Sequence, residues 1–332
     1  MIDGLKEIFT EFTQQKILVI GDVMLDDYLE GVVNRISPEA PVPVVDIIKR
    51  YDRLGGAANV ALNLKHLGAT PILCSVVGVC KKSDTFIELI QQECLSIEGI
   101  VRSETRKMTV KYRVLGNNVQ LLRMDDEDKH QLSENEYTEL IQRISTLLSE
   151  QKIAAIVFED YDKGVISSNL IDEVVQIAEQ YNIPITVDPK KRNFWDYHHI
   201  SIFKPNLKEL QESLLLDSVE VDDNTFETIA NFMREKHHKN ILLTLSEKGV
   251  IMLSMSNNEL SVYKIPAHVR NVSDVSGAGD TVIATATLCL TTSMNVKHIA
   301  ELANLAGGIV CEQVGVVAIE ATKLYQEALK IL

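Results

Sequence analysis

The stretch DVSGAGDTV (residues 274–282), followed by the run ATATLCL, is typical of a glycine-rich turn that leads into a buried helix. Glycines at positions 277 and 279 let the backbone turn tightly, so that successive N–H groups can point into one concavity and hold an anion. Asp280 falls in the first helical turn, where the helix dipole tolerates a carboxylate. The stretch fits both a phosphoryl-transfer site and plain strand-to-helix geometry, so the rest of the chain must distinguish them.

Composition excludes several classes of protein. The 332 residues, 45% of them hydrophobic, are enough for one large α/β core. A formal charge of −14 without a basic stripe argues against a nucleic-acid partner. The five cysteines lie far apart with no metal-ligand spacing, which predicts a reducing compartment and no structural zinc. Neither a signal peptide nor a run long enough to span a bilayer is found, so we expect a soluble cytoplasmic protein that does not contact a membrane.

Strands and helices alternate regularly after residue 133. Helices are expected at 133–149 and 167–181, and strands at 153–160, 183–189 and 201–206. Such alternation predicts a central, mainly parallel sheet with helices on both faces. The strand ends Asp22, Asp160, Asp188 and Asn206 would then line a crevice at the carboxyl edge of the sheet.

Two extended segments interrupt this pattern. One lies at about 28–50, and the other, at about 107–125, contains two alternating runs around a Gly-Asn-Asn hairpin signature. Together they predict a small separate sheet, which would serve as a lid on a single domain covering residues 1–332. The alternative is an ordinary antiparallel extension of the main sheet.

Known nucleotide signatures are absent: the sequence has no GxxxxGK[ST], no GxGxxG after a strand, and no HRD or DFG set. The remaining candidate for phosphate binding is the GAGD turn, in which Asp280 is able to accept a proton from an attacking hydroxyl. Asp22 and Asn59 are candidate ligands near the crevice. Gly55 and Gly56 open a helix, and either ligand approach or simple helix-entry geometry explains them.

Three motifs carry a resemblance to a known family. DVSGAGDTV resembles the C-terminal signature of the ribokinase-like (PfkB) carbohydrate kinases, GGAANVA (55–61) their N-terminal signature, and KPNLKE (204–209) their Asn-x-x-Glu motif. Further stretches are similar to bacterial D-glycero-D-manno-heptose 7-phosphate kinases: GDVMLDDY (21–28), RISPEAPVPV (35–44), EDYDKGV (159–165), VDPK (187–190) and ANLAGGIV (303–310).

The resemblance implies an ATP-dependent sugar kinase and a role for each matching position. Asp280 would be the catalytic base, and the backbone of Gly277, Ala278 and Gly279 the anion hole. Sugar contacts would come from Asp22, Gly55, Gly56 and Asn59. Asn206 and Glu209 would organise Mg²⁺ through water, while the turn Ser246–Gly249 and Asn304 would hold ATP. Asp274 and Ser276 resemble a monovalent-cation site of some members. Asn206 could also be a helix N-cap, and Asn304 a polar residue on an exposed helix face.

A phosphorylated acceptor needs a second anion site. The candidates are Lys190, Lys191 and Arg192, unless these three form a solvated loop, and Arg113 or Arg123 from the lid.

The sequence also departs from the heptose kinases. Glu159 stands where they commonly have serine, and the tail differs. Their second, nucleotidyltransferase domain has no counterpart here, so only the kinase step is implied. Ribose, fructose or a nucleoside therefore remain alternative acceptors, and a non-catalytic sugar sensor is a further alternative. The exposed edge of the lid favours a homodimer.

Overall fold

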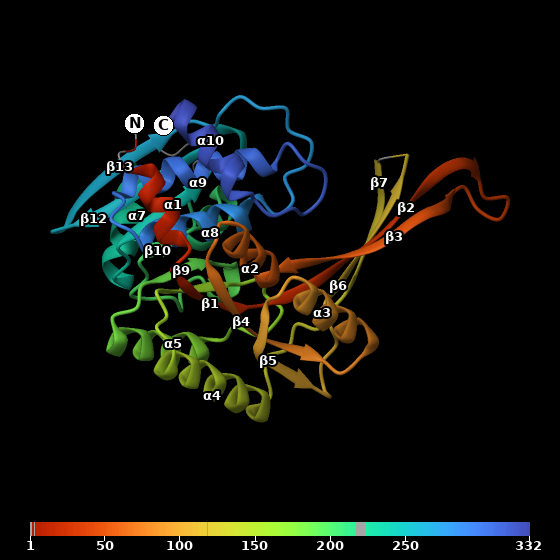
Figure 1. Ribbon diagram of the computed structural model, residues 1–332, viewed down its shortest axis with the longest axis horizontal. Helices are drawn as coiled ribbons and strands as arrows, with labels where there is room; N and C mark the ends of the chain where they lie inside the picture. The colour runs from red at the N-terminus through yellow and green to blue at the C-terminus, as the bar shows by residue number, and fades with distance from the viewer. Residues whose placement is uncertain (1, 3, 118, 217–222) are drawn as a thin grey trace.

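The computed structural model describes residues 2, 4–117, 119–216 and 223–332, and within them a nine-stranded sheet forms the centre of the molecule (Figure 1). Its strands follow the order β13-β12-β11-β10-β9-β8-β1-β4-β5. Neighbours run parallel from β11 to β5, and β12 and β13 are antiparallel. The strands are β1 (Lys16–Gly21), β4 (Thr70–Gly78), β5 (Ser96–Ser103), β8 (Ala155–Glu159), β9 (Ile185–Asp188), β10 (Ile202–Phe203), β11 (Asn240–Thr244), β12 (Val250–Ser256) and β13 (Glu259–Ile265). The predicted mainly parallel sheet is confirmed.

Helices cover both faces of this sheet because its central strands are apolar on both sides. In β1, Ile17 and Val19 belong to one hydrophobic core, and Leu18 and Ile20 belong to the other. The first core includes α1 (Leu5–Phe12), α2 (Ala57–His66), α3 (Lys81–Gln92), α8 (Ala278–Leu290), α9 (Val296–Val310) and α10 (Ala321–Ile331). The second includes α4 (Glu134–Glu150), α5 (Ser168–Tyr181), α6 (Leu207–Leu214) and α7 (Asp223–Lys236).

A second sheet of four strands, ordered β3-β2-β6-β7, forms an arm that projects from the main body (Figure 1). Its strands are β2 (Val23–Ile36), β3 (Pro43–Gly56), β6 (Val110–Gly116) and β7 (Val119–Asp126). The expected separate sheet is therefore present, and the alternative of an extension of the main sheet is wrong. Because β2 directly follows β1, and β3 leads into α2, the base of the arm lies at the carboxyl edge of the main sheet.

One local prediction differs from the structure, and two elements were not predicted. The strand expected over 201–206 is confined to Ile202–Phe203, with Asn206 adding one isolated bridge to Thr244. Pro205 lacks an N–H group and cannot extend the ladder. Helix α1 and strand β5 were not among the predicted elements. None of the described helices is both long and apolar enough to cross a bilayer.

Candidate active site

The N-terminus of α8 holds Asp280 at the centre of a group of buried polar side chains. Gly277, the residue before the helix, has φ 79°, a conformation that favours glycine, and a Cβ there would lie 2.9 Å from Asn59 Nδ2. Asp280 is 4% exposed. Asn59 Nδ2 donates to its Oδ2 at 2.7 Å, and the Tyr161 hydroxyl donates to its Oδ1 at 2.8 Å. Asp280, Gly277, Ala278, Gly279 and Asn59 are thus brought together.

Burial raises the pKa of Asp280 to about 6. The hydrogen bonds from Asn59 and Tyr161 oppose this shift because they stabilise the ionised carboxylate, whereas the negative charge of Asp188 adds to it. A carboxylate whose pKa lies this close to neutrality can take a proton from a hydroxyl and return it, as a general base must.

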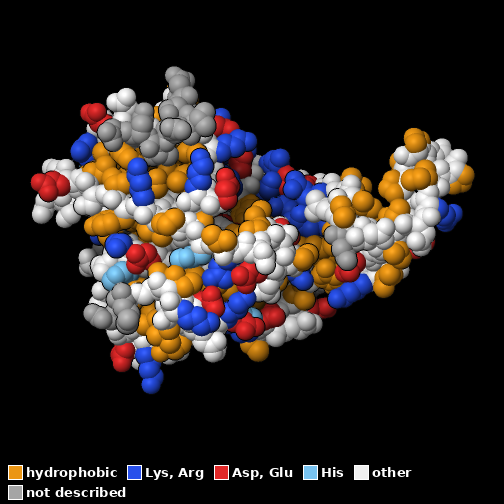
Figure 2. All heavy atoms as spheres, turned by 90° about the horizontal axis from the view of Figure 1, so that it is seen from above, with side chains coloured by type: hydrophobic (Ala, Val, Ile, Leu, Met, Phe, Trp, Pro, Cys, Tyr) orange, Lys and Arg blue, Asp and Glu red, His pale blue; other side chains and the backbone are white. Residues whose placement is uncertain are grey.

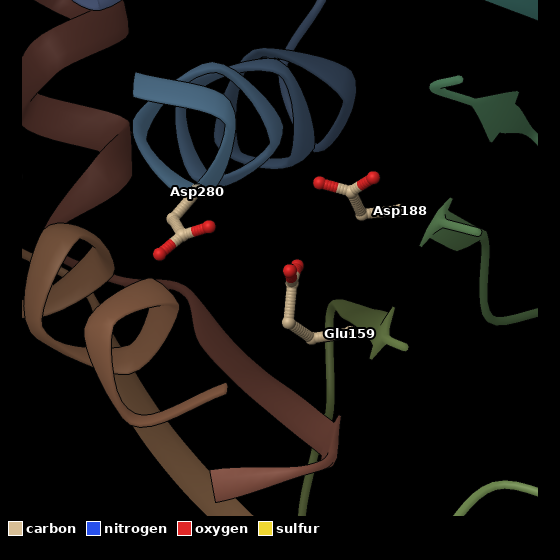
Figure 3. Close-up of side chains that lie close together, drawn as sticks. All are labelled: Glu159, Asp188 and Asp280. Atoms are coloured by element: carbon tan, nitrogen blue, oxygen red, sulfur yellow. The ribbon is translucent and has the colours of Figure 1, made fainter. Parts of the chain in front are cut away.

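Glu159 and Asp188, at the ends of β8 and β9, point toward Asp280 (Figure 3). One oxygen from each of the three carboxyl groups lies within 4.8 Å of the other two. Glu159 is 1% exposed, and neither of its carboxyl oxygens has a hydrogen-bond partner among the described residues. Burial, together with the charges of Asp188 and Asp280, raises the pKa of Glu159 well above its usual value. This group could therefore accept a proton or a cation.

A series of ion pairs leads from Asp188 to the predicted Asn-x-x-Glu motif. Lys204 Nζ lies 2.7 Å from Asp188 Oδ2, and Lys190 bridges Asp188 and Glu209. A Cβ on Gly279 would lie 3.5 Å from Lys204 Nζ, so this lysine faces the first turn of α8. Lys204 and the backbone N–H groups in the first turn of α8 therefore lie close together, and both are donors suited to binding a phosphate group.

Asn206 caps α6 through a reciprocal pair of hydrogen bonds. Its Oδ1 accepts from the Glu209 N–H, and its own N–H donates to Glu209 Oε2, both at 2.9 Å. The alternative reading of Asn206 as an N-cap is confirmed. Because Glu209 also contacts Lys190, the motif lies beside the buried carboxyl group and its position agrees with the predicted magnesium role, which stays a prediction.

Asp22 fixes the loop that follows β8. Its carboxylate accepts three backbone N–H groups, from Tyr161 at 2.9 Å, Lys163 at 3.0 Å and Val165 at 3.1 Å. The residue is buried, and burial raises its pKa. Asp22 therefore holds the loop that presents Tyr161, and its oxygens are already engaged within the protein.

The paired glycines allow two chain segments, 22–26 and 55–56, to lie close together. A Cβ on Gly56, whose φ is 61°, would lie 2.4 Å from the backbone oxygen of Asp22. A Cβ on Gly55 would lie 2.7 Å from Asp26 Oδ2. Both positions therefore require glycine for close approach, whether or not a sugar also binds there.

The candidate nucleotide residues lie together around the segment 265–266 that follows β13. Gly249 has φ 94°, and its Cβ would lie 2.2 Å from the backbone oxygen of Ile265. Asn304 Nδ2 donates to the Pro266 oxygen, one residue farther along, at 2.9 Å. Ser246 begins the short turn that Gly249 ends. Asn304 is 8% exposed, so the alternative of an exposed helix face is wrong.

The basic residues predicted to bind an acceptor phosphate are each paired with a carboxylate. Arg113 donates twice to Asp26 Oδ1, at 2.7 and 3.0 Å, and Arg123 Nε lies 2.9 Å from Asp125. The remaining pairs are Lys190 with Glu209, Lys191 with Glu212, and Arg192 with Asp162.

Asp274 and Ser276 lie in the turn before α8. Asp274 accepts the backbone N–H groups of Ser276 and Gly315 at 3.0 and 2.9 Å. Although burial opposes the shift, these amides hold the pKa of Asp274 below its usual value. An ionised carboxylate beside the GAGD turn is compatible with a monovalent cation, which stays a prediction.

Several residues of the site were not singled out from the sequence. Tyr161 contacts Asp280, Lys204 pairs with Asp188, and Asp26 lies against Gly55. Asn63 accepts the Thr281 hydroxyl at 2.9 Å and the Ile319 N–H at 3.0 Å, which fixes α2 against α8. Tyr161 and Lys204 lie within the motifs EDYDKGV and KPNLKE, and these motifs were the only features of the sequence that could have indicated them.

Comparison with known proteins gives the class that this fold and site define. The family model of the pfkB family carbohydrate kinases matches residues 14–323. The chain therefore belongs to the pfkB family of carbohydrate kinases.

Individual relatives agree with this assignment. The chain is 39% identical over 94% of its length to the bifunctional protein HldE of Methylobacillus flagellatus, and 37% identical over 91% to that of Helicobacter acinonychis. It spans 62% and 64% of the length of these two relatives.

Solved structures share the fold. Phosphofructokinase-2 from Escherichia coli, in its tetrameric inhibited form, superposes with a TM-score of 0.74 at 16% identity, covering 94% of this chain and 98% of that one. Arabidopsis thaliana ribokinase complexed with ribose and ATP gives 0.68 at 15% identity, covering 94% and 99%.

Proposed function

We propose that the protein transfers the γ-phosphoryl group of ATP to D-glycero-D-manno-heptose 7-phosphate and forms the 1,7-bisphosphate. The observation that carries the kinase chemistry is the buried Asp280 in the first turn of α8, hydrogen-bonded to Asn59 and Tyr161. The acceptor is supported by the sequence similarity to heptose 7-phosphate kinases over nearly the whole chain and by relatives that are 37–39% identical.

In this proposal Asp280 removes the proton from the attacking hydroxyl as the phosphoryl group is transferred. The backbone N–H groups of Gly277, Ala278 and Gly279, with Lys204 opposite them, stabilise the charge on that group. Gly55, Gly56 and Asn59 orient the sugar, and Asp22 supports them by fixing the loop that carries Tyr161. Because phosphoryl transfer needs little covalent chemistry from the protein, positioning and charge neutralisation supply most of the rate.

ATP binds beside this group in the proposal. Ser246, Gly249 and Asn304 hold the nucleotide, and Asn206 and Glu209 face Mg²⁺ through water. Oxygen-rich acidic sites suit this hard cation, and the unpartnered oxygens of Glu159 next to Asp188 fit a positive charge. Bound magnesium would neutralise phosphate charge. A monovalent cation at Asp274 and Ser276 is a further part of the proposal, since E. coli phosphofructokinase-2 has been solved in complex with potassium.

The replacement Asp280→Asn tests the base. The amide keeps the size and accepts a hydrogen bond, so we expect folding and ATP binding to persist while kcat falls by about 10²- to 10⁴-fold. Coupled ADP detection measures the rate, and calorimetry with ATP is the control. Near-normal turnover would refute the assignment of the base.

A panel of acceptors separates the proposed substrate from its alternatives. Heptose 7-phosphate should give the highest kcat/KM, above heptose, ribose, fructose and nucleosides. A preference for one of the others would keep the kinase and change the acceptor. Sugar binding without ADP release from any acceptor would indicate a sensor instead.

A further inference from the structure

Lys111, in the base of the arm, is a half-buried lysine whose ammonium group has no acceptor in the described part of the chain. Among the described residues, no hydrogen bond or ion pair reaches its Nζ, although a lysine carries three donors. Burial, with Arg113 and Lys163 nearby, lowers its pKa in spite of the charges of Asp26 and Asp125. An unpaired cation held away from water is costly unless a ligand supplies the missing acceptor.

The carboxylates that flank Lys111 in the sheet are already engaged. Lys111 is opposite Asp26 on β2 and opposite Asp125 on β7. Arg113 forms an ion pair with Asp26, and Arg123 forms one with Asp125. The adjacent Lys163 pairs with Glu127 at 2.8 Å. The sheet therefore neutralises these neighbours in pairs and leaves Lys111 with its charge uncompensated.

Tyr161 connects Lys111 to the reacting end of the site. Its hydroxyl contacts Asp280, and Lys111 Nζ lies over its ring, 5.2 Å from the ring centre. Lys111 is thus separated from the base by about the length of a tyrosine side chain. An acceptor that presents a hydroxyl to Asp280 could place a charged group at its other end beside Lys111. The view from above shows basic side chains gathered where the arm meets the body (Figure 2).

We propose that Lys111 binds the phosphate group of a phosphorylated sugar acceptor and so makes the site specific for sugar phosphates. The inference rests on the proposed function, because it assigns the acceptor's phosphate to a residue of that site. A heptose with its reacting hydroxyl on C1 and its phosphate on C7 carries the two groups at opposite ends, as binding to both Asp280 and Lys111 requires. A lysine acts there as a point charge with free donors, which suits a phosphate group.

The test uses the full chain and the replacement Lys111→Met, which keeps the length of the side chain and removes its charge. We expect the KM for heptose 7-phosphate to rise by about 10- to 100-fold, the effect of losing one hydrogen bond to a charged group. The KM for ATP should not change, and the loss of kcat/KM should be much larger for heptose 7-phosphate than for unphosphorylated heptose. Lys111→Arg should restore part of the preference. The matched control is Lys107→Met, since Lys107 is exposed and pairs with Asp126 outside the site.

Binding measured by calorimetry separates this inference from the proposed function. The wild-type protein should bind heptose 7-phosphate more tightly than heptose, and Lys111→Met should abolish the difference. Inorganic phosphate should compete with heptose 7-phosphate in the wild type only. A wild-type protein that shows this binding but no turnover would refute the proposed function and leave the inference standing.

Two outcomes would overturn the inference. One is a Lys111→Met variant that binds heptose 7-phosphate as tightly as the wild type, and the other is a wild type that binds both sugars equally. Loss of folding is excluded by thermal unfolding: removing an unpaired, half-buried charge should leave the melting temperature unchanged or raise it.

Discussion

Asp280 shows how one residue is tuned by opposing influences. Burial moves its pKa to about 6, while the donors of Asn59 and Tyr161 keep it from rising farther. A general base must be ionised, so we expect kcat/KM to fall as the pH drops through this value. In the proposed mechanism the two donors set the acidic limit of activity as well as the direction in which the carboxylate points.

Removing the hydroxyl of Tyr161 should move the acidic limit of the kcat/KM profile. In Tyr161→Phe the ionised carboxylate loses one hydrogen bond, so its pKa rises and the acidic limb of the kcat/KM profile shifts upward by about one unit. The measurement is the pH dependence of kcat/KM with a coupled ADP assay. Tyr137→Phe, which loses a hydroxyl bonded to Glu173 on the other face of the sheet, is the control and should not shift the limb. A limb that stays in place or moves downward would contradict the assignment.

Glu159 predicts a pH-dependent loss of stability. Burial and the charges of Asp188 and Asp280 raise the pKa of Glu159 in the folded state, so the folded protein holds this proton to a higher pH than the unfolded chain, in which Glu159 ionises around its ordinary value of about 4.5. The unfolded state then binds fewer protons, so stability falls as the pH rises above 4.5. Glu159→Gln is neutral in both states, and its urea midpoint relative to wild type should increase as the pH rises above about 4.5, the ordinary pKa of the unfolded chain. The exposed Glu134→Gln is the control and should follow the wild type. A constant difference would show that Glu159 is ionised when buried.

At the scale of the elements, the residues of the site come from the ends of strands and the first turns of helices. Strands β8 and β9 deliver Glu159 and Asp188, and the first turns of α2 and α8 deliver Asn59 and Asp280. Parallel strands end at one edge of a sheet, and the following helices begin near it, so polar residues at these positions meet there. The position of the site follows from topology, whereas its chemistry depends on which side chain each end carries.

The cap of α6 separates a structural from a metal-related role for Asn206. Asn206→Ala loses the hydrogen bond to the Glu209 N–H and should lower the free energy of unfolding by about 1 kcal/mol. Asn206→Ser keeps a capping oxygen and should retain stability. Ser133→Ala, which removes the equivalent cap of α4 far from the site, gives the matched loss without an effect on kinetics.

Kinetics then test the second role of Asn206. If it also faces magnesium, both Asn206 variants should raise the KM for MgATP, whereas Ser133→Ala should not. A normal KM in Asn206→Ser would leave the residue with its capping role alone. Urea denaturation and coupled ADP detection supply the two measurements.

At the scale of the whole molecule, the arm is the feature that the main body does not explain. Its strands expose large apolar side chains that a folded monomer would normally cover, among them Ile47, Ile48, Val119 and Leu122. We propose that a second copy of the chain covers them and that the protein is a homodimer through the arm.

A charge on the arm should therefore dissociate the dimer. Ile48, with 74% of its surface exposed, is a suitable site because Ile48→Asp would bury a carboxylate in the interface without affecting the core. Sedimentation velocity should show a dimer for the wild type and a monomer for the variant. Leu329→Asp, at an exposed position of α10, should remain dimeric. A wild type that sediments as a monomer would refute this interface.

Much of the architecture could be predicted because it depends on local pattern. The apolar strands, the alternation after residue 133 and the detached segments at 28–50 and 107–125 led to the observed sheets. Asn59 and Asp280 were predicted because each lies beside glycines at the start of a helix. The sequence could not indicate that Asp22 would be enclosed by backbone amides, because that depends on the loop 161–165, which is distant in the chain.

The sequence alone determined the class of fold, the glycine-rich turn before α8 and the family, because periodicity, glycine spacing and motif order are properties of the chain itself. Only the tertiary structure decided which charges are paired. Arg113 was a candidate for the acceptor's phosphate and proved to be bound to Asp26, while Lys111, two residues earlier, has no hydrogen-bond or ion-pair partner in the part of the chain that the structure describes. Pairing depends on which side chains a sheet places opposite one another, and on how much water reaches them, and both arise only when distant segments meet.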